Sequence, residues 1–362
     1  MALAKITLQN FRNHGESTLD QTAQFNLLVG ENGAGKTNVL EAISLLAPGR
    51  GLRRASLSEL PQRGSDGERA GGFAIGASLT EQGQVTARLG TYMTPDRPGR
   101  RFARVNGAEA SAATLSQWHA VSWLTPSMDG IFTDSAGARR RFVDRMTLAI
   151  EPDHARAVSR YENALRERNR LLEDRAEPRW LDAVEGQLAT AGENVATNRA
   201  QLIARLDEEL GTLPSEPFAR PIVSYRPGGA TSREGLLRDY AAGRRRDRAA
   251  GRALSGPHRD EMEVRMAKSG LEAGVCSTGE QKAMLIAITL AHGVLAAFDR
   301  PSVLLLDEVA AHLDPVRRSE LFRRLRDARA QVWLTGTELA PFADIAGEAA
   351  IWRVENGGVA PL

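Results

Sequence analysis

The first part of the chain, from residue 4 to about residue 125, alternates apolar and polar residues in the way that is typical of β-strands. Residues 5–8 alternate, and residues 25–29 form a short apolar run that ends at a glycine. Residues 73–92 are predicted to form two strands around a Gln82-Gly83 turn, and Asn106-Gly107 predicts another hairpin. One helix is expected here, directly after residues 30–37, because Val39, Leu40 and Ile43 recur at helical spacing.

The middle of the chain, from about residue 137 to residue 250, has the apolar spacing of helices, with a break at Pro178. Apolar residues recur in steps of three and four on both sides of that proline, with Asn198 occupying one position of the series: Val158, Tyr161, Leu165 and Leu172 before it, and Leu181, Val184, Leu188, Ala191, Val195 and Leu202 after it. This pattern predicts an antiparallel pair of helices packed on a body, each too short for a long coiled-coil arm.

The last part of the chain, from about residue 257, returns to alternating helices and strands. Residues 301–306 end in Val-Leu-Leu-Leu, and a strand that is apolar on both faces belongs in the middle of a parallel sheet. A helix is predicted from about residue 315 to 328, and a strand over residues 331–335. The chain is therefore predicted to be an α/β protein in three segments, residues 1–136, 137–250 and 251–362, in which the helical segment is inserted between two halves of one sheet domain.

The composition indicates an ordinary globular protein, since 42% of the 362 residues are hydrophobic and 25% are charged. No run of apolar residues is long enough to span a membrane, and the N-terminal residues lack the features of a secretion signal. Cys276 is the only cysteine, which excludes an internal disulfide framework. We therefore expect a cytoplasmic protein, in which Cys276 is a packing residue.

The net charge is only +2, so its distribution is more informative than its sum. Between residues 220 and 259 there are ten arginines and three acidic residues, and a second group consists of Arg97, Arg100, Arg101 and Arg104. Such patches can contact a phosphate backbone, although a charged run is more often only a solvated face. Charge alone leaves nucleic-acid binding open.

The first motif with clear chemistry is Gly30-Glu-Asn-Gly-Ala-Gly-Lys36-Thr37, which fits the pattern G-x-x-x-x-G-K-[ST] between a strand and a helix. The glycines allow backbone N–H groups to converge on phosphate oxygens at a helix N-terminus. Lys36 is expected to contact the β- and γ-phosphates, and the Thr37 hydroxyl to ligate Mg²⁺. The alternative, a glycine-rich turn with a chance Lys-Thr pair, is disfavoured by the flanking strand and helix. The motif predicts binding of a nucleoside triphosphate, ATP.

The second motif is the acidic pair Asp307-Glu308 at the end of the apolar run. An acid at that end of a parallel strand lies where open α/β sheets bind ligands. Asp307 is expected to hold Mg²⁺, and Glu308 to act as the general base on the attacking water. The pair alone is a weak signal that a strand leaving the core would also produce; together with the phosphate loop it becomes strong.

The third motif is Ser277-Thr-Gly279-Glu280-Gln281, at the start of a long apolar helix. Ser277 and Glu280 are spaced as a helix-capping box, which explains those two residues but not the whole order. Upstream of the acidic strand, this order resembles the signature sequence of ABC-type ATPases, whose serine binds the γ-phosphate held by another copy. Beyond Glu308, the stretch that ends at Asp314 resembles the loop that crosses the dimer interface in that family.

A narrower resemblance spans nearly the whole chain and is to the RecF family of bacterial recombination mediators. It rests on residues 8–13, 30–38, 40–43, 124–126 and 139–145, and on Gly256-Pro-His-Arg-Asp260. The resemblance implies an ATPase head that is similar to the heads of chromosome-maintenance ATPases without their long arms, and that contains a mixed sheet, an antiparallel β-subdomain and an inserted helical domain. It further implies nucleotide contacts from these residues: Arg12, Gly30, Glu31, Asn32, Gly33, Ala34, Gly35, Lys36, Thr37, Asn38, Ser277, Gly279, Gln281 and Asp314.

Members of that family dimerise around two ATP molecules and bind double-stranded DNA. The resemblance therefore implies work with RecR and RecO at single-strand/double-strand junctions, support of RecA loading, and a place in DNA replication, recombination and the SOS response to DNA damage. Among the arginines, those of the helical segment and of the run 244–248 are the expected DNA contacts. His258 is equally consistent with a structural role and with contact to nucleotide or DNA, and Arg12 could instead be an exposed residue at a strand end.

Two departures from the general ABC pattern point to slow hydrolysis. Many ABC proteins have a glutamine where this chain has Ser122-Trp-Leu124, and Gln117 is close to that position, with its register left open by the sequence. Many also have a histidine where this chain has Thr335-Gly-Thr-Glu338. We therefore expect a weak, DNA-stimulated ATPase that works as a switch. The alternatives are the ATP-binding subunit of a membrane transporter and a protein that holds ATP without hydrolysing it.

Overall fold

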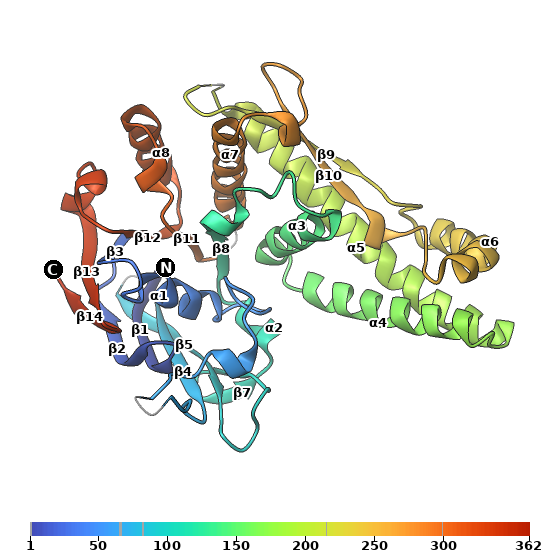
Figure 1. Cartoon of the computed structure of the whole chain (residues 1–362), viewed down its shortest axis with the longest axis horizontal. Helices are drawn as coiled ribbons and strands as arrows, with labels where there is room; N and C mark the ends of the chain where they lie inside the picture. Colours follow the sequence, from blue (N-terminus) through green and yellow to red (C-terminus); the bar gives the residue numbers. More distant parts are fainter. Residues whose placement is uncertain (1, 65–66, 82, 215, 299) are drawn as a thin grey trace. The chain divides into compact units, whose positions relative to one another are not determined.

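The computed structural model describes residues 2–64, 67–81, 83–214, 216–298 and 300–362. The chain divides into two compact units (Figure 1). The first consists of the residues up to Met128 together with His292–Leu362, and the second is Asp129–Ala291. The second unit extends beyond the helical segment predicted over residues 137–250, because strand β10, Glu261–Met266, pairs with strand β9, Pro221–Arg226.

The core of the first unit is a six-stranded mixed sheet in the order β14-β13-β3-β12-β11-β8. All its strands run parallel except β14 at the edge. Every residue of β3, β8, β11 and β12 is buried, as expected for strands covered on both faces. The strand bounds are β3 Phe25–Val29, β8 Ala120–Leu124, β11 Ser302–Leu306, β12 Gln331–Gly336, β13 Ala349–Glu355 and β14 Gly358–Pro361. The interior position predicted for residues 301–306 is confirmed, since β11 has a parallel strand on each side.

The same unit contains a six-stranded antiparallel sheet in the order β2-β1-β4-β5-β6-β7. Both predicted hairpins are present; Gln82 itself lies outside the described residues. Asn106 and Gly107 have φ angles of 52° and 84°, the positive values that a tight two-residue hairpin turn requires. The strand bounds are β1 Ala2–Phe11, β2 His14–Asp20, β4 Phe73–Glu81, β5 Gln84–Met93, β6 Phe102–Val105 and β7 Ala108–Ala110.

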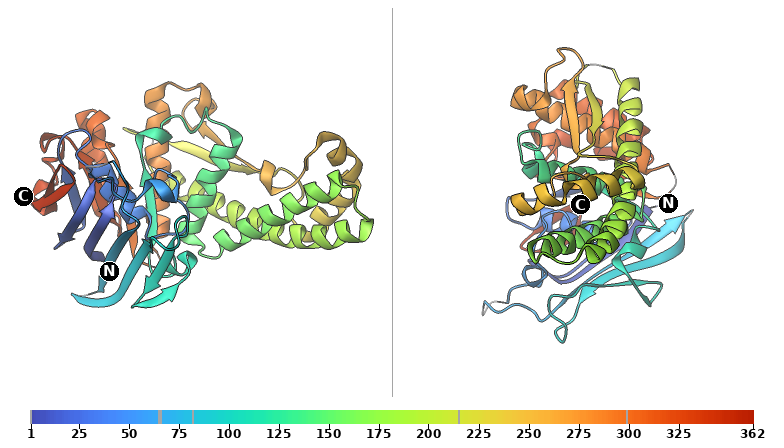
Figure 2. Two further views of the ribbon diagram at one scale, coloured as in Figure 1. Left: turned by 60° about the horizontal axis from the view of Figure 1, so that its bottom comes forward. Right: turned by 90° about the vertical axis from the view of Figure 1, so that its right-hand side faces the viewer.

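Helix α1, Lys36–Ser44, packs against strands of both sheets, since it contacts β1 on one side and β8 and β12 on the other. Its residues Val39, Leu40, Ala42 and Ile43 are fully buried between the sheets, which explains the helical spacing of apolar residues after residue 37. Helix α8, Pro315–Asp327, confirms the helix predicted near residue 315 (Figure 2). The remaining short helices are α2 Ala112–Leu115 and the 3-10 turns Leu57–Glu59, Pro126–Met128, Ala310–His312, Ala340–Phe342 and Ala346–Glu348.

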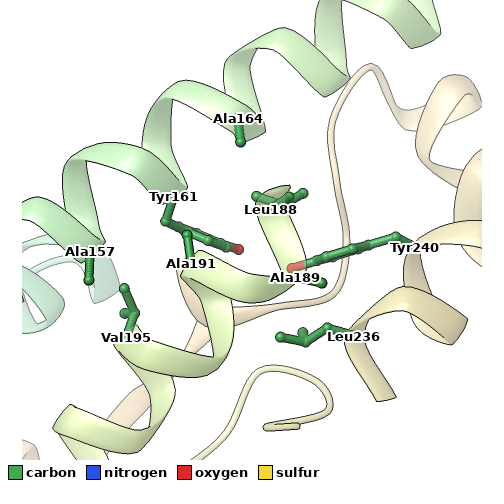
Figure 3. Close-up of a cluster of buried hydrophobic side chains, with 9 residues drawn as sticks. All are labelled: Ala157, Tyr161, Ala164, Leu188, Ala189, Ala191, Val195, Leu236 and Tyr240. Carbon is green, nitrogen blue, oxygen red and sulfur yellow. The ribbon is translucent and has the colours of Figure 1, made fainter. Parts of the chain in front are cut away.

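The second unit is mainly helical. Helices α4 and α5 lie side by side and run antiparallel, which confirms the predicted pair (Figure 1). Their facing side chains form a buried cluster around Tyr161, Leu188 and Val195, joined by Leu236 and Tyr240 of α6 (Figure 3). The bounds are α3 Ala136–Ile150, α4 His154–Glu173, α5 Pro178–Thr212 and α6 Arg233–Ala250, with 3-10 turns at Pro257–Arg259 and Ala273–Val275.

Helix α7, Thr278–Ala296, begins in the second unit and ends in the first. Most of its apolar residues are buried, among them Met284, Leu285 and Ile288, whereas Val294 is exposed. None of the described helices, α7 included, combines the length and hydropathy that crossing a bilayer demands.

Candidate nucleotide-binding site

Three neighbouring strands of the mixed sheet end at the same edge and bring the predicted phosphate loop and acidic pair together. The loop follows β3, the acids follow β11, and β12 lies between these strands. The backbone N–H of Gly30 donates to the Gly336 carbonyl at 3.3 Å, which joins the start of the loop to the end of β12. The carboxyl ends of parallel strands are where open α/β sheets bind ligands.

The phosphate loop depends on glycine at two positions. A Cβ atom at residue 30 would lie 2.1 Å from the carbonyl oxygen of Val354, so the loop can pass β13 only with glycine there. Gly35 has a φ angle of 119°, which L-residues with side chains rarely adopt, and directly precedes α1. The loop therefore turns into the helix with its backbone N–H groups at a helix N-terminus.

The Lys36 ammonium folds back over the loop, where it donates to the carbonyl oxygens of Gly30 at 2.6 Å and Glu31 at 2.8 Å. Only 4% of the residue is exposed. Burial lowers the pKa of Lys36, while the nearby Glu308 and Asp307 carboxylates oppose that shift. The ammonium is thus held inside the loop, with the two acids close enough to favour its charge.

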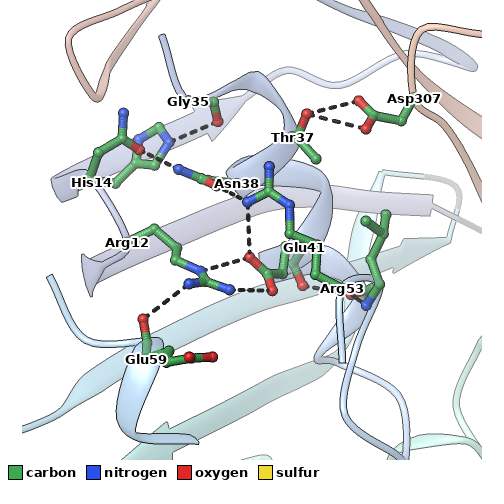
Figure 4. Close-up of polar contacts among 12 residues, drawn as sticks. Arg12, His14, Gly35, Thr37, Asn38, Glu41, Arg53, Glu59 and Asp307 are labelled. Carbon is green, nitrogen blue, oxygen red and sulfur yellow. Dashed lines mark hydrogen bonds and ion pairs between the residues drawn. The ribbon is translucent and has the colours of Figure 1, made fainter. Parts of the chain in front are cut away.

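Thr37 and Asp307 meet across the loop, with the Thr37 hydroxyl 3.0 Å from Oδ1 and 3.2 Å from Oδ2 of the carboxylate (Figure 4). Thr335 of β12 donates a second hydrogen bond, 2.9 Å to Asp307 Oδ1. Burial nevertheless raises the pKa of Asp307, and the neighbouring Glu308 adds to the increase. A buried carboxylate whose pKa is raised by desolvation is a site where a further cation would be stabilised.

Glu308 occupies an unusual backbone conformation, with a φ angle of 55°. Its backbone N–H donates to the Thr335 hydroxyl at 2.9 Å, which holds that conformation. Among the described residues, no side chain or backbone group donates a hydrogen bond to its carboxylate. Strained conformations persist where the surroundings enforce them, and they concentrate at functional sites.

The exposed face of the loop borders a pocket of about 730 Å³. Glu31, Asn32 and Gly33 are exposed there, and Ala34 is half-buried. The opposite wall includes Thr337, Leu339 and Arg353. The loop residues predicted to contact nucleotide therefore line open space.

A set of polar residues, of which the predicted nucleotide contacts included only Asn38, fixes the loop from outside (Figure 4). Asn13 donates to the Ala34 carbonyl at 2.9 Å and accepts a bond from Asn38 at 2.7 Å. His14 Nε2 lies 3.2 Å from the Gly35 carbonyl, and Arg53 donates to Asn38. Asn13 lies within the family-like opening 8–13, but His14 and Arg53 have no sequence pattern that marks them, because their partners are far away in the chain.

Arg12 forms an ion pair with Glu41 of α1, in which Nε and Nη2 each lie 2.8 Å from one carboxylate oxygen. Glu41 is fully buried, whereas 19% of the Arg12 side chain is exposed. Arg12 also donates to the Glu59 carbonyl. It is therefore not a solitary exposed residue at a strand end, and its contact with nucleotide stays a prediction.

The residues of the predicted signature cap α7 in the second unit. The backbone N–H of Ser277 donates to Glu280 at 2.9 Å, and the Glu280 N–H donates back to the Ser277 hydroxyl, so the capping box is present. Gln281 donates to the Cys276 carbonyl, and a Cβ at Gly279 would meet nothing within 4 Å. In the first unit, Asp314 caps α8 by accepting the N–H of Arg317 at 3.0 Å. Contacts of these residues with the nucleotide of a second copy stay a prediction.

Both departures from the ABC pattern have a structural counterpart. Gln117 precedes the amino end of β8, and β8 runs parallel to β11, so Gln117 lies at the edge of the sheet opposite to Asp307. It cannot replace the glutamine that many ABC proteins have. Thr335 lies at the end of β12 in place of the missing histidine and contacts Asp307 directly.

Solved structures support this fold. A recombination mediator protein RecF bound to an ATP analogue, described as part of the RecFOR pathway, superposes with a TM-score of 0.86 at 22% identity, covering 100% of this chain and 98% of that one. An Smc head bound to the C-winged helix domain of ScpA matches with a TM-score of 0.54 at 17% identity, covering 100% and 98%. The predicted α/β ATPase head, with its antiparallel sheet and helical domain, is thereby confirmed.

Comparison of sequences leads further. Residues 2–354 match the RecF/RecN/SMC N-terminal domain family. The DNA replication and repair protein RecF of Mesorhizobium japonicum is 43% identical over 374 aligned residues, which cover 99% of this chain and 97% of the relative. The protein of the same name from Brucella suis biovar 1 is 43% identical over 371 residues, covering 99% and 95%. The chain belongs to the RecF family of DNA replication and repair proteins.

Proposed function

We propose that this protein is an ATP-dependent DNA-binding switch of recombinational repair. The observation that carries the proposal is the contact between Thr37 of the phosphate loop and Asp307 of the acidic strand, with the Lys36 ammonium held in the same loop. This constellation lies at the ligand-binding edge of the sheet. The RecF structure of the same fold contains an ATP analogue, which supports ATP as the ligand.

The donor set fits magnesium and a triphosphate. The structure offers one carboxylate and one hydroxyl, Asp307 and Thr37, and in the described part of the chain no group of three or more His, Cys, Asp or Glu side chains converges as a metal cage. Mg²⁺ is typically held by one or two carboxylates together with substrate phosphates and waters. A cation at Thr37 and Asp307 would also stabilise the charged form of Asp307, whose pKa is raised by burial.

Hydrolysis is assigned to Glu308 as the general base on water. Its carboxylate accepts no hydrogen bond from the described residues, and Thr335 fixes its backbone. Lys36 would hold the β- and γ-phosphates and neutralise part of their charge. It would act through its charge and position and form no covalent bond to the phosphates. Because the chain lacks the usual glutamine and histidine, we infer slow hydrolysis that times the release of a dimer.

The dimer would enclose two nucleotides, each held by the phosphate loop of one copy and by the α7 N-terminus of the other. Ser277 and Gly279 are exposed at the start of α7, and Asp314 begins α8. Backbone N–H groups at a helix start favour an anion. This assignment rests on the family resemblance and on the accessibility of these residues.

Duplex DNA near single-strand gaps is the proposed substrate, with RecO and RecR as partners in RecA loading. Support comes from relatives named DNA replication and repair proteins and from the solved recombination mediator of the RecFOR pathway. A transporter subunit is not favoured by membership of this family. A protein that holds ATP without hydrolysis remains the competing assignment for the site itself.

The test measures oligomeric state, duplex binding and phosphate release with no nucleotide, with ADP and with ATP. With ATP, wild type should dimerise and bind duplex DNA. Glu308→Gln should dimerise but release phosphate at least about 100-fold more slowly than wild type. Lys36→Met should neither dimerise nor bind duplex DNA. Wild-type behaviour of Lys36→Met would reject the proposed site. If Glu308→Gln with ATP were only monomeric, the switch would be wrong, and unchanged phosphate release from it would remove Glu308 as the base.

A further inference from the structure

A basic pocket of about 570 Å³ lies wholly within the second unit, away from the phosphate loop in sequence. The residues that line this basic pocket include Arg140, Arg226, Gly228, Arg252, His258 and Arg259. Its lining includes His258 and Arg259 of the Gly256-Pro-His-Arg-Asp260 motif, which takes no part in the nucleotide site described above.

The pocket carries excess positive charge. Arg226 is paired with Glu263 at 2.7 Å, and the one acid in the wall, Glu261, is paired with Arg139 at 2.7 Å. Among the described residues, the remaining three guanidinium groups, of Arg140, Arg252 and Arg259, form no ion pair, and Arg140 donates only to a backbone carbonyl at 3.3 Å.

Asp260, a further acid beside the pocket, is already bound by other groups. Its carboxylate accepts bonds from Arg199 at 2.9 Å, from the Tyr225 hydroxyl at 2.6 Å and from the Gly228 N–H at 2.9 Å. Asp260 is 3% exposed, so it belongs to the interior rather than to the pocket surface. The pocket is therefore built with a deficit of negative charge that a ligand can supply.

The loop that carries Arg252 and Arg259 is fixed against the loop that follows β9. The Gly256 N–H donates to the Gly228 carbonyl at 3.1 Å, and a Cβ at Gly228 would lie 2.5 Å from the backbone of Arg259, so the loops touch. His258 closes the arrangement, with Nδ1 2.7 Å from the Tyr161 hydroxyl and Nε2 3.0 Å from the Ala253 carbonyl.

His258 is thus a positioning residue. Burial lowers the pKa of its imidazole, and Arg259 and Arg140 lower it further, so the ring is neutral at neutral pH and adds no charge of its own. With both ring nitrogens engaged, it holds the loop between Ala253 and Arg259 in one conformation. Preorganised loops lose less entropy on binding a ligand.

The chemistry of the pocket selects phosphate groups on a backbone. Guanidinium groups bind phosphate through two parallel hydrogen bonds. No Phe, Tyr or Trp ring lines the pocket among the described residues, so it offers no platform on which an unpaired base could stack. Both properties suit a duplex, whose phosphates are exposed and whose bases are stacked inside.

We propose that the basic pocket binds backbone phosphates of double-stranded DNA, through Arg252 and Arg259 at its rim and Arg140 inside it. This inference rests on the proposed DNA-binding function and assigns residues to it. It differs from the sequence-based expectation for the run 244–248, in which Arg244 is bound to Asp182 and Glu185 and Arg248 donates to the Leu172 carbonyl. Those two arginines hold helices together.

The test compares duplex binding of the full chain and the double variant Arg252→Gln/Arg259→Gln in ATP, over a salt series. Both residues are exposed, so the fold should survive, and ATP-dependent dimerisation provides the check. Affinity should fall about tenfold, and the slope of log affinity against log salt should decrease by about 2. The matched control is Arg323→Gln/Arg329→Gln, which removes two exposed arginines outside both the pocket and the helical segment and should bind like wild type.

The outcomes distinguish a failure of the pocket assignment from a failure of the proposed ATP-dependent DNA binding. If wild type binds duplex and the pocket variant matches it in affinity and slope, the pocket assignment is wrong while the function stands. If wild type does not bind duplex in any nucleotide state, the proposed function fails first. If the pocket variant lost binding to single-stranded DNA but kept wild-type binding to duplex DNA, the assignment of the pocket to duplex DNA would be wrong. If Arg252→Gln/Arg259→Gln fails to dimerise, the double variant Arg252→Lys/Arg259→Lys replaces it. The lysines keep the positive charge but lose the two parallel hydrogen bonds of a guanidinium group. This variant must then bind duplex DNA more weakly than wild type for the proposal to stand.

Discussion

The Thr335 hydroxyl donates to Asp307 Oδ1 at 2.9 Å and accepts the backbone N–H of Glu308 at 2.9 Å, so one side chain of β12 orients both acids of β11. Thr335 is only 1% exposed. The threonine lies where the general ABC pattern would place a histidine. It fixes the acids rather than reaching for the phosphate.

Replacement of Thr335 by Val should therefore impair hydrolysis more than ATP binding. The change leaves the Glu308 N–H without its acceptor, at a cost of about 1–3 kcal/mol, and it frees the left-handed Glu308 backbone to relax. We expect single-turnover phosphate release to fall about tenfold or more, with a smaller change in the Kd for ATP.

Thr335→Ser is the matched control, because it keeps the hydroxyl and loses only a methyl group. It should retain most of the rate. If the Val and Ser variants slow hydrolysis equally, packing rather than the hydroxyl is responsible, and the role assigned to Thr335 is wrong.

Asp307 should make the ligand-free protein less stable as pH rises. A carboxyl whose folded pKa is raised binds its proton more tightly in the folded state, so its stabilising contribution is complete below the unfolded pKa and is lost as pH rises through the folded pKa. Asp307→Asn removes that titration while keeping an oxygen acceptor for Thr37 and Thr335. The melting temperature of the variant, relative to wild type, should therefore increase between about pH 4 and pH 8.

Addition of Mg²⁺ and ATP at about pH 8 should make the melting temperature of wild type higher than that of Asp307→Asn. The reason is that only wild type holds the cation and is stabilised by ligand binding. Thermal unfolding with and without ligand measures both effects. A difference between the two proteins that stays constant with pH would show that Asp307 does not titrate in this range.

Much of the head could be predicted because its elements are local in sequence. The apolar run 302–306, the loop 30–37 and the Asn106-Gly107 turn each contain their own structural instruction within a few residues. Their order along the chain then places loop and acids at one edge of a parallel sheet, where Thr37 and Asp307 do meet.

The supporting residues could not be found in this way. Thr335, His14 and Arg53 gain their roles from partners 12 to 28 residues away in sequence or from adjacent strands. Threonine at a strand end or arginine in a loop has many structural uses, so no local pattern singles them out. The basic pocket was missed for the same reason: residue counts between 220 and 259 do not reveal that Arg244 is neutralised and Arg252 is not.

The pair Arg12 and Glu41 should contribute to stability through the burial of the acid. Glu41 is fully buried and keeps only Arg53, at 3.5 Å, when Arg12 is removed. Arg12→Met should therefore destabilise the first unit by about 3 kcal/mol, while Arg12→Met/Glu41→Met should recover most of that loss. Denaturant unfolding measures both.

The same variants test whether Arg12 also contacts nucleotide. If its only role is to neutralise Glu41, the double variant should bind ATP with the wild-type Kd. A Kd that stays raised when stability has recovered would assign Arg12 a direct contact, as the family resemblance implies.

Arg168 and Arg170 of α4 form the same number of ion pairs in opposite surroundings, so they isolate the effect of burial. Arg168 is fully buried and contacts Glu185 and Asp247 at 2.8 Å each, and it donates to the Tyr240 carbonyl. It thereby joins α4 to α5 and α6. Arg170 is 58% exposed and contacts Glu167 and Asp174.

Arg168→Met should destabilise the helical unit by about 3–5 kcal/mol, because Asp247 is left buried without a cation. Arg170→Met should leave the denaturant midpoint unchanged, since solvent already screens its partners. Arg168→Met/Asp247→Asn should regain part of the loss, because it removes the unpaired charge but not the packing defect. If Arg168→Met and Arg170→Met had equal midpoints, the buried network would not hold the three helices together, and the apolar cluster around Tyr161 would have to do so alone.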